Sequence, residues 1–193
     1  MGNSLSPILA NIFMEFIETN VIKTLDLKPK LFKRYVDDCF VIWNHGITTI
    51  QQFFQKFNTF HDQIIMTIEI EQNKKIPFLD VLIDHNEQLK LNVYTKPTNC
   101  DIYLNYNSNH PTSTKIGIVK NLQTRAENII SNKEDLKVEQ EHIKQALMKN
   151  NYPEQFIKKH ITSKRGKENK EKDKDIRTNV SILYIKGISE KIR

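Results

Sequence analysis

Residues 31–43, LFKRYVDDCFVIW, constrain the fold of this chain more than any other segment. Two arms rich in aromatic and β-branched residues, 31–36 and 39–43, flank the adjacent carboxylates of Asp37 and Asp38. Such arms favour β-strands, and a short polar break between two of them is typical of a hairpin. The segment therefore predicts a strand, a tight turn and a strand, with both aspartates at the tip.

A helix is expected before this hairpin. Ser6 is a typical N-cap residue, and Pro7 is compatible with a first helical turn. Apolar residues then recur at helical spacing, and the pattern extends to about Lys23. The residues that carry it are Ile8, Leu9, Ile12, Phe13, Phe16 and Ile17. Pro29 separates this helix from the hairpin.

Residues 48–96 predict a second helix followed by short strands. Thr48 and Gln51 fit a capping box, and a row of phenylalanines from Phe53 to Phe60 follows at helical spacing. That spacing favours core packing over base stacking. Apolar and polar residues alternate over 66–71 and 89–96, and 76–84 is a third apolar strand after a turn at 73–75. The order of elements predicts an α+β fold.

From Ser113 onward the apolar spacing becomes helical. It predicts two helices within 113–149 and a short third one at 153–160. The polar stretch that follows cannot bury a core and is typical of a linker, after which 180–186 predicts another strand. The expected organisation is a strand-bearing domain at 1–100, a helical module at 101–161, a basic flexible linker at 162–179, and the start of a further region at 180–193.

The net charge of +6 is concentrated in one part of the chain. Residues 158–177 hold nine basic and four acidic side chains, a net charge of +5. This stretch is either a solvated tether or a contact for a nucleic-acid backbone. No apolar run is long enough to span a membrane, and no secretory signal is expected. Cys39 and Cys100 are not in a CxxC pair, which argues for a reducing compartment and against a zinc site.

The aspartate pair carries the clearest chemical expectation. Two crowded carboxylates repel each other unless a cation neutralises them. Mg²⁺ prefers carboxylate and phosphate oxygens, so Asp37 and Asp38 could present Mg²⁺ to a nucleotide. A solvated turn without any metal explains the same residue pair.

Several motifs together resemble a known family. Tyr35-Val36-Asp37-Asp38 resembles the metal-binding hairpin of reverse transcriptases, and GNSLSPILAN, from Gly2, resembles the glycine-plus-helix motif that precedes it. Four further stretches resemble Penelope-like retroelements, and 101–161 resembles the helix-turn-helix domain of animal reverse transcriptases. These stretches are KKIPFLDVLI, VYTKPTNCDIYLNYNSNHP, KNLQTRAENI and ILYIKGISEKIR. The resemblance implies a partial polymerase palm followed by a small helical thumb.

The same resemblance implies roles for individual residues. Asp37 and Asp38 would be the catalytic metal ligands, and Tyr35 would lie beside the primer terminus or the incoming nucleotide. Gly2, Ser6 and Pro7 would shape the floor under the nucleotide and template, although a plain helix start explains Ser6 and Pro7 equally well. In the helical module, backbone phosphates would be contacted by Lys115, Lys120 and Arg125, for which ordinary surface charge is an equal alternative. Lys74 and Lys75 favour a solvated hairpin over a pyrophosphate contact.

The implied function is RNA-directed DNA polymerisation: Mg²⁺-dependent nucleotide transfer to a DNA primer on an RNA template, inside the cell and in the nucleus. No membrane association and no small-molecule cofactor are implied. The family places a third catalytic aspartate upstream of the glycine motif, so this chain is expected to encode half of the metal site and to be inactive alone. The alternatives are a non-catalytic nucleic-acid-binding remnant and a decayed fragment that does not fold stably.

Overall fold

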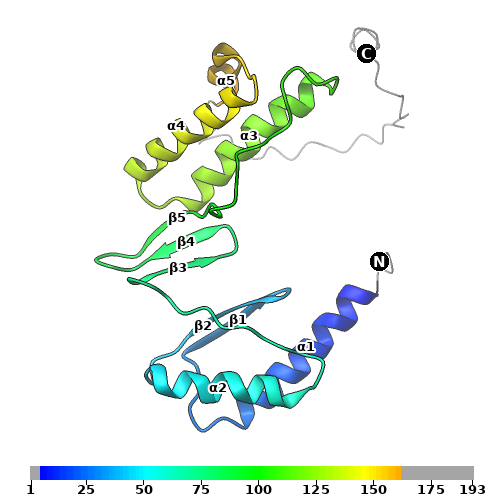
Figure 1. Cartoon of the computed structure of the whole chain (residues 1–193), viewed down its shortest axis with the longest axis vertical. Helices are drawn as coiled ribbons and strands as arrows, with labels where there is room; N and C mark the ends of the chain where they lie inside the picture. The colour runs from blue at the N-terminus through cyan, green and yellow to red at the C-terminus, as the bar shows by residue number, and fades with distance from the viewer. Residues whose placement is uncertain (1–4, 162–193) are drawn as a thin grey trace, which may run out of the picture. The chain divides into compact units, whose positions relative to one another are not determined.

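The computed structural model describes residues 5–161 of the 193-residue chain. Helices and strands alternate in its first half, and helices alone make up its last part, which confirms the α+β class (Figure 1). In chain order the elements are α1 (Ser6–Lys23), β1 (Leu31–Tyr35), β2 (Asp38–Ile42), α2 (Ile47–Phe60), β3 (Lys75–Phe78), β4 (Val81–Asp84), β5 (Lys90–Val93), α3 (Thr112–Ile129), α4 (Lys133–Lys149) and α5 (Glu154–His160).

The chain forms two compact units that divide after Leu79. Unit 1 contains the elements α1 to β3, and unit 2 contains β4 to α5. The boundary predicted from the sequence lies at residue 100 instead. Strands β4 and β5 belong with the helices because β5 packs against α3, and the backbone N–H of Ser131 donates to the carbonyl of Leu91 on β5 at 3.1 Å.

The core of unit 1 lies between α1 and α2. Ile17 and Val21 of α1 are each 1% exposed, and they form one buried cluster with Phe53 and Phe57 of α2. The ring of Phe57 stacks on that of Phe32 from β1, with centroids 5.6 Å apart. Burial of Phe53 and Phe57 confirms that the phenylalanine row serves core packing, while Phe60 remains exposed.

Helix α1 ends at Lys23 as expected, but its start differs from the prediction. Leu5 is the N-cap residue and Ser6 is already helical, with no side-chain cap hydrogen bond. From its N-cap to Phe16 the helix carries exposed apolar side chains, between 41% and 61% exposed, whereas Ile17 and Val21 nearer its end are buried. This exposed stripe consists of Leu5, Ile8, Leu9, Ile12, Phe13 and Phe16.

The predicted capping box of α2 is wrong. Gly46, with φ 86°, is the N-cap residue, and no side chain caps the helix. Only glycine adopts this backbone conformation at low cost. The hydroxyl of Thr49 instead donates to the carbonyls of His45 and Gly46, at 2.9 Å each.

Two of the predicted strands also differ. Residues 66–71 form no strand, because the backbone of Met66 bonds to the side chain of Asn58 rather than to a neighbouring strand. The single strand expected over 76–84 is split into β3 and β4 by a turn at Leu79, whose φ is 54°. The turn before β3 is confirmed, with positive φ at Asn73 and Lys74. Within unit 2, β4 pairs antiparallel with β5, and Val81 lies opposite Val93.

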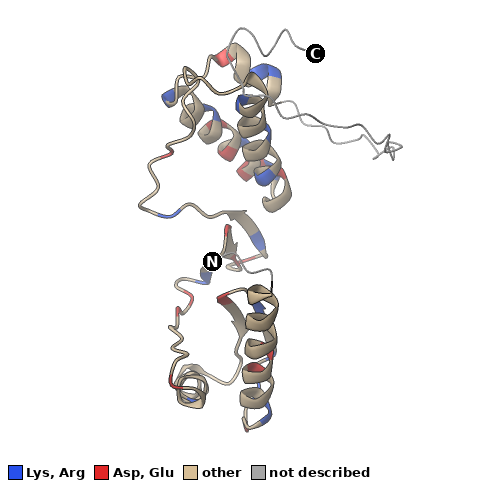
Figure 2. Ribbon diagram, turned by 90° about the vertical axis from the view of Figure 1, so that its right-hand side faces the viewer, with Lys and Arg blue, Asp and Glu red and all other residues tan. Residues whose placement is uncertain are grey.

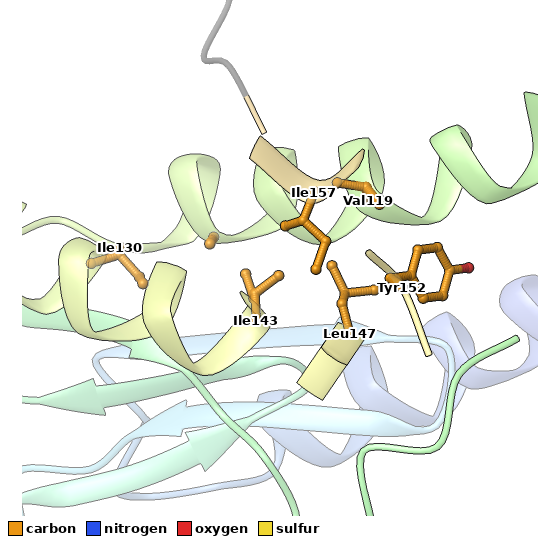
Figure 3. Close-up of a cluster of buried hydrophobic side chains, with 7 residues drawn as sticks. Val119, Ile130, Ile143, Leu147, Tyr152 and Ile157 are labelled. Carbon is orange, nitrogen blue, oxygen red and sulfur yellow. The ribbon is translucent and has the colours of Figure 1, made fainter. Parts of the chain in front are cut away.

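Unit 2 has its own core, and its three helices confirm the predicted helical module. Val119 from α3, Leu147 from α4 and Ile157 from α5 are fully buried. Their side chains point toward one another between the helices (Figure 3). The rest of the cluster is Ala126, Ile130, Ile143 and Tyr152.

Asn150, at the end of α4, forms hydrogen bonds with the segment before α3. The side-chain amide of Asn150 donates to the carbonyl of Asp101 at 2.7 Å and accepts from the backbone N–H of Tyr103 at 3.0 Å. The backbone carbonyl of Asn150 also accepts from Tyr106 at 3.0 Å. Within the described residues, no helix has the length and apolar character needed to cross a membrane. The predicted linker and the strand at 180–186 lie outside these residues.

Candidate metal-binding hairpin and nucleic-acid-binding helices

The hairpin β1–β2 confirms the expected strand, turn and strand. Tyr35 pairs with Asp38 at the end of the ladder, which leaves Val36 and Asp37 as the two turn residues. Asp38 is therefore the first residue of β2 rather than part of the turn. Val36 has φ 54° whereas the φ of Asp37 is not positive, and a positive φ at the first central residue alone is typical of a type II′ hairpin turn. A β-branched residue in this conformation is strained, and such strain is concentrated at functional sites.

Arg34 connects the turn to α1. Its Nη1 donates to the carbonyl of Val36 at 3.0 Å and to Oδ1 of Asn11 at 3.1 Å. Its Nε forms an ion pair with Glu18, and the two side chains are only 12% and 16% exposed. One guanidinium thus bonds to the turn and to two positions of the helix. The sequence does not single out Arg34, because Lys33 beside it carries the same charge in the same arm.

Asp37 and Asp38 are both exposed at the end of this hairpin. Among residues 5–161, no group of three or more histidine, cysteine or acidic side chains is arranged to hold a metal ion. Mg²⁺ commonly uses one or two carboxylates and completes its octahedron with water and substrate phosphates. The donor set of Asp37 and Asp38 fits that mode of binding.

Cys39 follows the aspartates on β2 and is half-buried. Burial raises the pKa of its thiol to about 11, Glu18 and Asp38 act in the same direction, and the positive charge of Arg34 opposes them. A thiol with such a raised pKa is a poor nucleophile at neutral pH. Cys39 therefore fits a packing role beside the carboxylates rather than a catalytic one.

The other residues expected at this site are placed as follows. Ser6 and Pro7 lie in the exposed first turn of α1. Tyr35 is 63% exposed at the end of β1, next to the turn. Gly2 lies outside the described residues. The turn lysines differ in position: Lys74 lies in the tight turn before β3, and Lys75 begins that strand.

In unit 2, Lys115 occupies an interior position. Its residue is 6% exposed, and its Nζ donates to the carbonyl of Ser108 at 2.8 Å. The ammonium also lies 5.2 Å from the ring centroid of Tyr106. These partners hold the segment before α3 against the helix. A phosphate contact would require Lys115 to leave both of them.

Arg125 is likewise engaged within unit 2. Its Nη2 lies 3.3 Å from the carboxylate of Asp80 and donates to the carbonyl of Tyr94 at 3.5 Å. Its side chain is 35% exposed, so part of the guanidinium faces solvent. Arg125 thus links α3 to the turn before β4 and to the end of β5.

Lys120, in contrast, is exposed on α3. The pKa of His160, at the end of α5, is lowered by burial and further by the charges of Lys159 and Lys120. The two lysines come from different helices and act on the same ring. They therefore form a local cationic surface, of which only Lys120 is predicted from the sequence.

A second titratable cluster joins α4 to the preceding loop. The Nε2 of His142 lies 3.0 Å from the carboxylate of Asp101, and its Nδ1 lies 3.5 Å from that of Glu139. Burial alone would lower the pKa of His142, but the hydrogen bond to Asp101 and the charges of both carboxylates raise it overall. No spacing in the sequence indicates this cluster, because Asp101 and His142 are far apart along the chain.

Part of the chain is similar to a known protein family. Residues 102–162, less than half of the chain, match the animal helix-turn-helix domain, and they correspond to α3, α4 and α5 with the segment before them. No curated protein and no solved structure matches the chain. A helix-turn-helix domain is therefore identified in unit 2, and helix-turn-helix domains are a class of nucleic-acid-binding module.

Proposed function

We propose that this chain is part of an RNA-directed DNA polymerase of the Penelope-like type. In this proposal unit 1 is the hairpin-bearing part of the palm, and unit 2 is a thumb that holds the primer–template duplex. The chain binds nucleic acid through unit 2 and lacks polymerase activity by itself. Two-metal phosphoryl transfer requires more carboxylates than the hairpin provides, and the family resemblance places the next one upstream of Gly2.

The observation that carries the proposal is the hairpin turn bound to α1 by Arg34. The turn contains a strained valine, and exposed carboxylates occupy its second position and the first position of β2. Arg34 fixes the turn carbonyl to the helix that follows the glycine motif. A solvated turn without function has no need of strain or of a buried ion pair, so this construction supports a site that positions a ligand.

The exposed stripe of α1 supports the partial-palm interpretation. Apolar patches of this kind mark surfaces that contact other protein. In Figure 2 the first turns of α1 are tan, which means that they carry almost no charged residues. In the proposal, further parts of the polymerase cover this stripe.

Mg²⁺ would be held by Asp37 and Asp38 together with nucleotide phosphates. The ion would neutralise the charge that develops on the transferred phosphoryl group. The protein contributes the placement of its two carboxylates, which the Arg34 contacts hold relative to α1. Tyr35 and the first turn of α1 would contact the nucleotide or the primer end.

A titration of labelled RNA–DNA primer–template hybrid with the full chain tests the binding part. We expect dissociation constants of about 10⁻⁴–10⁻⁶ M without sequence preference, which is the range of backbone-dominated binding. If about five phosphates are contacted, log K should fall with log salt at a slope of roughly −3.5 to −4.5. Absence of binding at about 50 mM salt by a folded chain, or strong sequence preference, would contradict the proposal.

Deletion of 162–175 separates the helical module from the basic stretch. The deletion removes six basic and four acidic residues, a net charge of only +2. An unchanged salt slope would assign the contacts to the helices of unit 2, as proposed. A collapsed slope would assign them to the deleted stretch and would contradict binding through these helices.

A non-catalytic nucleic-acid-binding remnant is the second candidate. It is favoured by the match of residues 102–162 to the animal helix-turn-helix domain, which points to nucleic-acid binding and not to polymerase activity. Both candidates predict binding without primer extension, and they differ in metal binding. A remnant gives no preferential binding of a divalent cation at Asp37 and Asp38 in the presence of nucleotide, whereas the polymerase fragment does.

A further inference from the structure

The exposed residues of α3 are unusual in their lack of acidic side chains. Eight positions of this helix are exposed, and each is a small residue, a hydroxyl, an amide or a lysine. These residues are Thr112, Ser113, Thr114, Gly117, Lys120, Asn121, Thr124 and Asn128. All of the polar ones can donate a hydrogen bond, and hydroxyl, amide and lysine groups are those that contact sugar–phosphate backbones.

The single acidic residue of α3 is already engaged. The amide of Gln123 donates to the carboxylate of Glu127 at 2.7 Å, and Glu127 is not among the exposed positions. The exposed side of the helix therefore presents no carboxylate to repel a phosphate.

Helix α4 has the opposite character. It contains four acidic residues, and its exposed positions mix both charges with Val138 and Met148. Lys144 lies 3.1 Å from Glu154, and Lys158 lies 3.0 Å from the same carboxylate. Interspersed charges that pair within the protein are typical of a solvated surface.

Gly117 gives a second, independent indication. A glycine inside a helix costs backbone entropy, and here a Cβ atom would meet nothing within 4 Å. Packing within the described residues therefore does not require a glycine at this position. Gly117 lies one turn before Lys120 on the exposed side, where the missing side chain allows a ligand backbone to approach the helix closely.

The cationic surface continues from α3 onto α5. Helix α5 packs against α3, and burial together with the charges of Lys159 and Lys120 lowers the pKa of His160. The ring of Phe156 packs against that of His160, with centroids 4.7 Å apart, and fixes its position on α5. A phosphate near the two lysines would meet positive charge contributed by both helices.

We propose that the exposed side of α3, together with Lys159 at the end of α5, is the surface of unit 2 that contacts the sugar–phosphate backbone of a nucleic-acid duplex, and that the exposed side of α4 is not. This inference rests on the proposed nucleic-acid binding by unit 2 and assigns the contact to one surface. The contacts position the duplex without reading its sequence.

Matched charge substitutions in the full chain test this assignment. Thr124→Glu adds a negative charge to the α3 surface, and Val138→Glu adds the same charge to the exposed side of α4, where Val138 is 71% exposed. With a labelled RNA–DNA duplex, Thr124→Glu should weaken binding by about tenfold, because it places a carboxylate against phosphates. Val138→Glu should change the affinity less than about twofold.

Lys120→Ala and Lys137→Ala form a second pair, one exposed lysine from each helix. Lys120→Ala should reduce the slope of log K against log salt by about 1, the change expected for one lost phosphate contact. Lys137→Ala should leave the slope unchanged. Gly117→Gln distinguishes ligand approach from folding. It should raise the midpoint of urea unfolding, because glutamine favours a helix, and should still weaken binding several-fold.

The outcomes separate this inference from the proposed function. If the unmodified chain does not bind the duplex, the proposed function fails. If it binds, and folded Thr124→Glu and Gly117→Gln bind equally well, the assignment to α3 is overturned while binding by the chain remains. Equal weakening by Thr124→Glu and Val138→Glu would also overturn it, since the effect would then follow net charge alone.

Discussion

The guanidinium of Arg34 forms an ion pair with the carboxylate of Glu18, and both side chains are largely buried. Arg34 lies on β1, two residues before the turn, and Glu18 lies in the second half of α1. The same guanidinium donates to the turn carbonyl of Val36 at 3.0 Å. This pair therefore couples the position of the hairpin turn to the helix beneath it.

Removal of Glu18 should destabilise unit 1. Glu18→Ala leaves the buried charge of Arg34 without its partner, so we expect a loss of about 2–3 kcal/mol in the free energy of unfolding. Trp43 is the single tryptophan of the chain and packs against the core of unit 1, so its fluorescence during urea unfolding reports this unit. Glu15→Ala, at an exposed position of the same helix, is the control and should cost less than about 0.5 kcal/mol.

Replacement of the strained turn residue should stabilise the hairpin. Val36 is 63% exposed, so Val36→Gly loses little packing, and glycine adopts a φ of 54° without strain. We expect a gain of about 1 kcal/mol, since relief of strain exceeds the entropic cost of glycine. Val41→Gly, within β2 and packed on the core, should instead destabilise unit 1. A clear loss of stability in Val36→Gly would contradict the type II′ turn.

The two cysteines should differ in their reaction with thiol reagents. Cys39 is half-buried and the pKa of its thiol is raised to about 11, so little thiolate is present at pH 8. Cys100 is exposed. At about pH 8 a chromogenic disulfide should modify one thiol rapidly and the other slowly, and Cys100→Ser should remove the rapid phase. Rapid modification of Cys39 would mean that the hairpin opens readily from α1.

The His142 cluster predicts a pH dependence in unit 2. The pKa of His142 is raised above the ordinary value of 6.5, so the folded state binds a proton more tightly than the unfolded state does. Its contribution to stability is fully present below about pH 6.5 and is lost as the pH rises through the folded-state pKa. The stability difference between the unmodified chain and His142→Gln, followed by far-UV circular dichroism, should be larger near pH 5.5 than near pH 8.5. A difference independent of pH would contradict the ion pairs.

Much of the fold follows from local patterns. The hairpin at 31–43 and the helices of unit 2 are predicted correctly. In each of them the apolar side chains recur at the spacing of a strand or a helix, and neighbouring elements pack against them. The strand expected at 66–71 fails for a physical reason: alternation shows that a segment can form a strand, but a strand also requires a partner. Asn58 bonds the backbone of Met66 instead. The sequence does not indicate the turn at Leu79 that divides 76–84 into two strands, because leucine rarely adopts a positive φ.

The site was predictable only in its sequence-local part. Two adjacent aspartates between apolar arms indicate a hairpin tip, although the register that places Asp38 in β2 requires the structure. The contacts of Arg34 with Glu18 and of Asn150 with Asp101 join residues that are distant in the chain. The interior position of Lys115 is similarly hidden, since a lysine in a helical period is ordinarily a surface residue.

Divalent-metal binding at the hairpin tests the central proposal most directly. With Mn²⁺ and a nucleoside triphosphate added to the full chain, we predict selective paramagnetic broadening of the amide resonances of residues 36–39, because two carboxylates and the nucleotide phosphates together hold the ion. Asp37→Asn should abolish this broadening, and Asp62→Asn, at an exposed position of the same unit, should leave it intact. Broadening spread evenly over exposed carboxylates, or unaffected by Asp37→Asn, would contradict the polymerase interpretation.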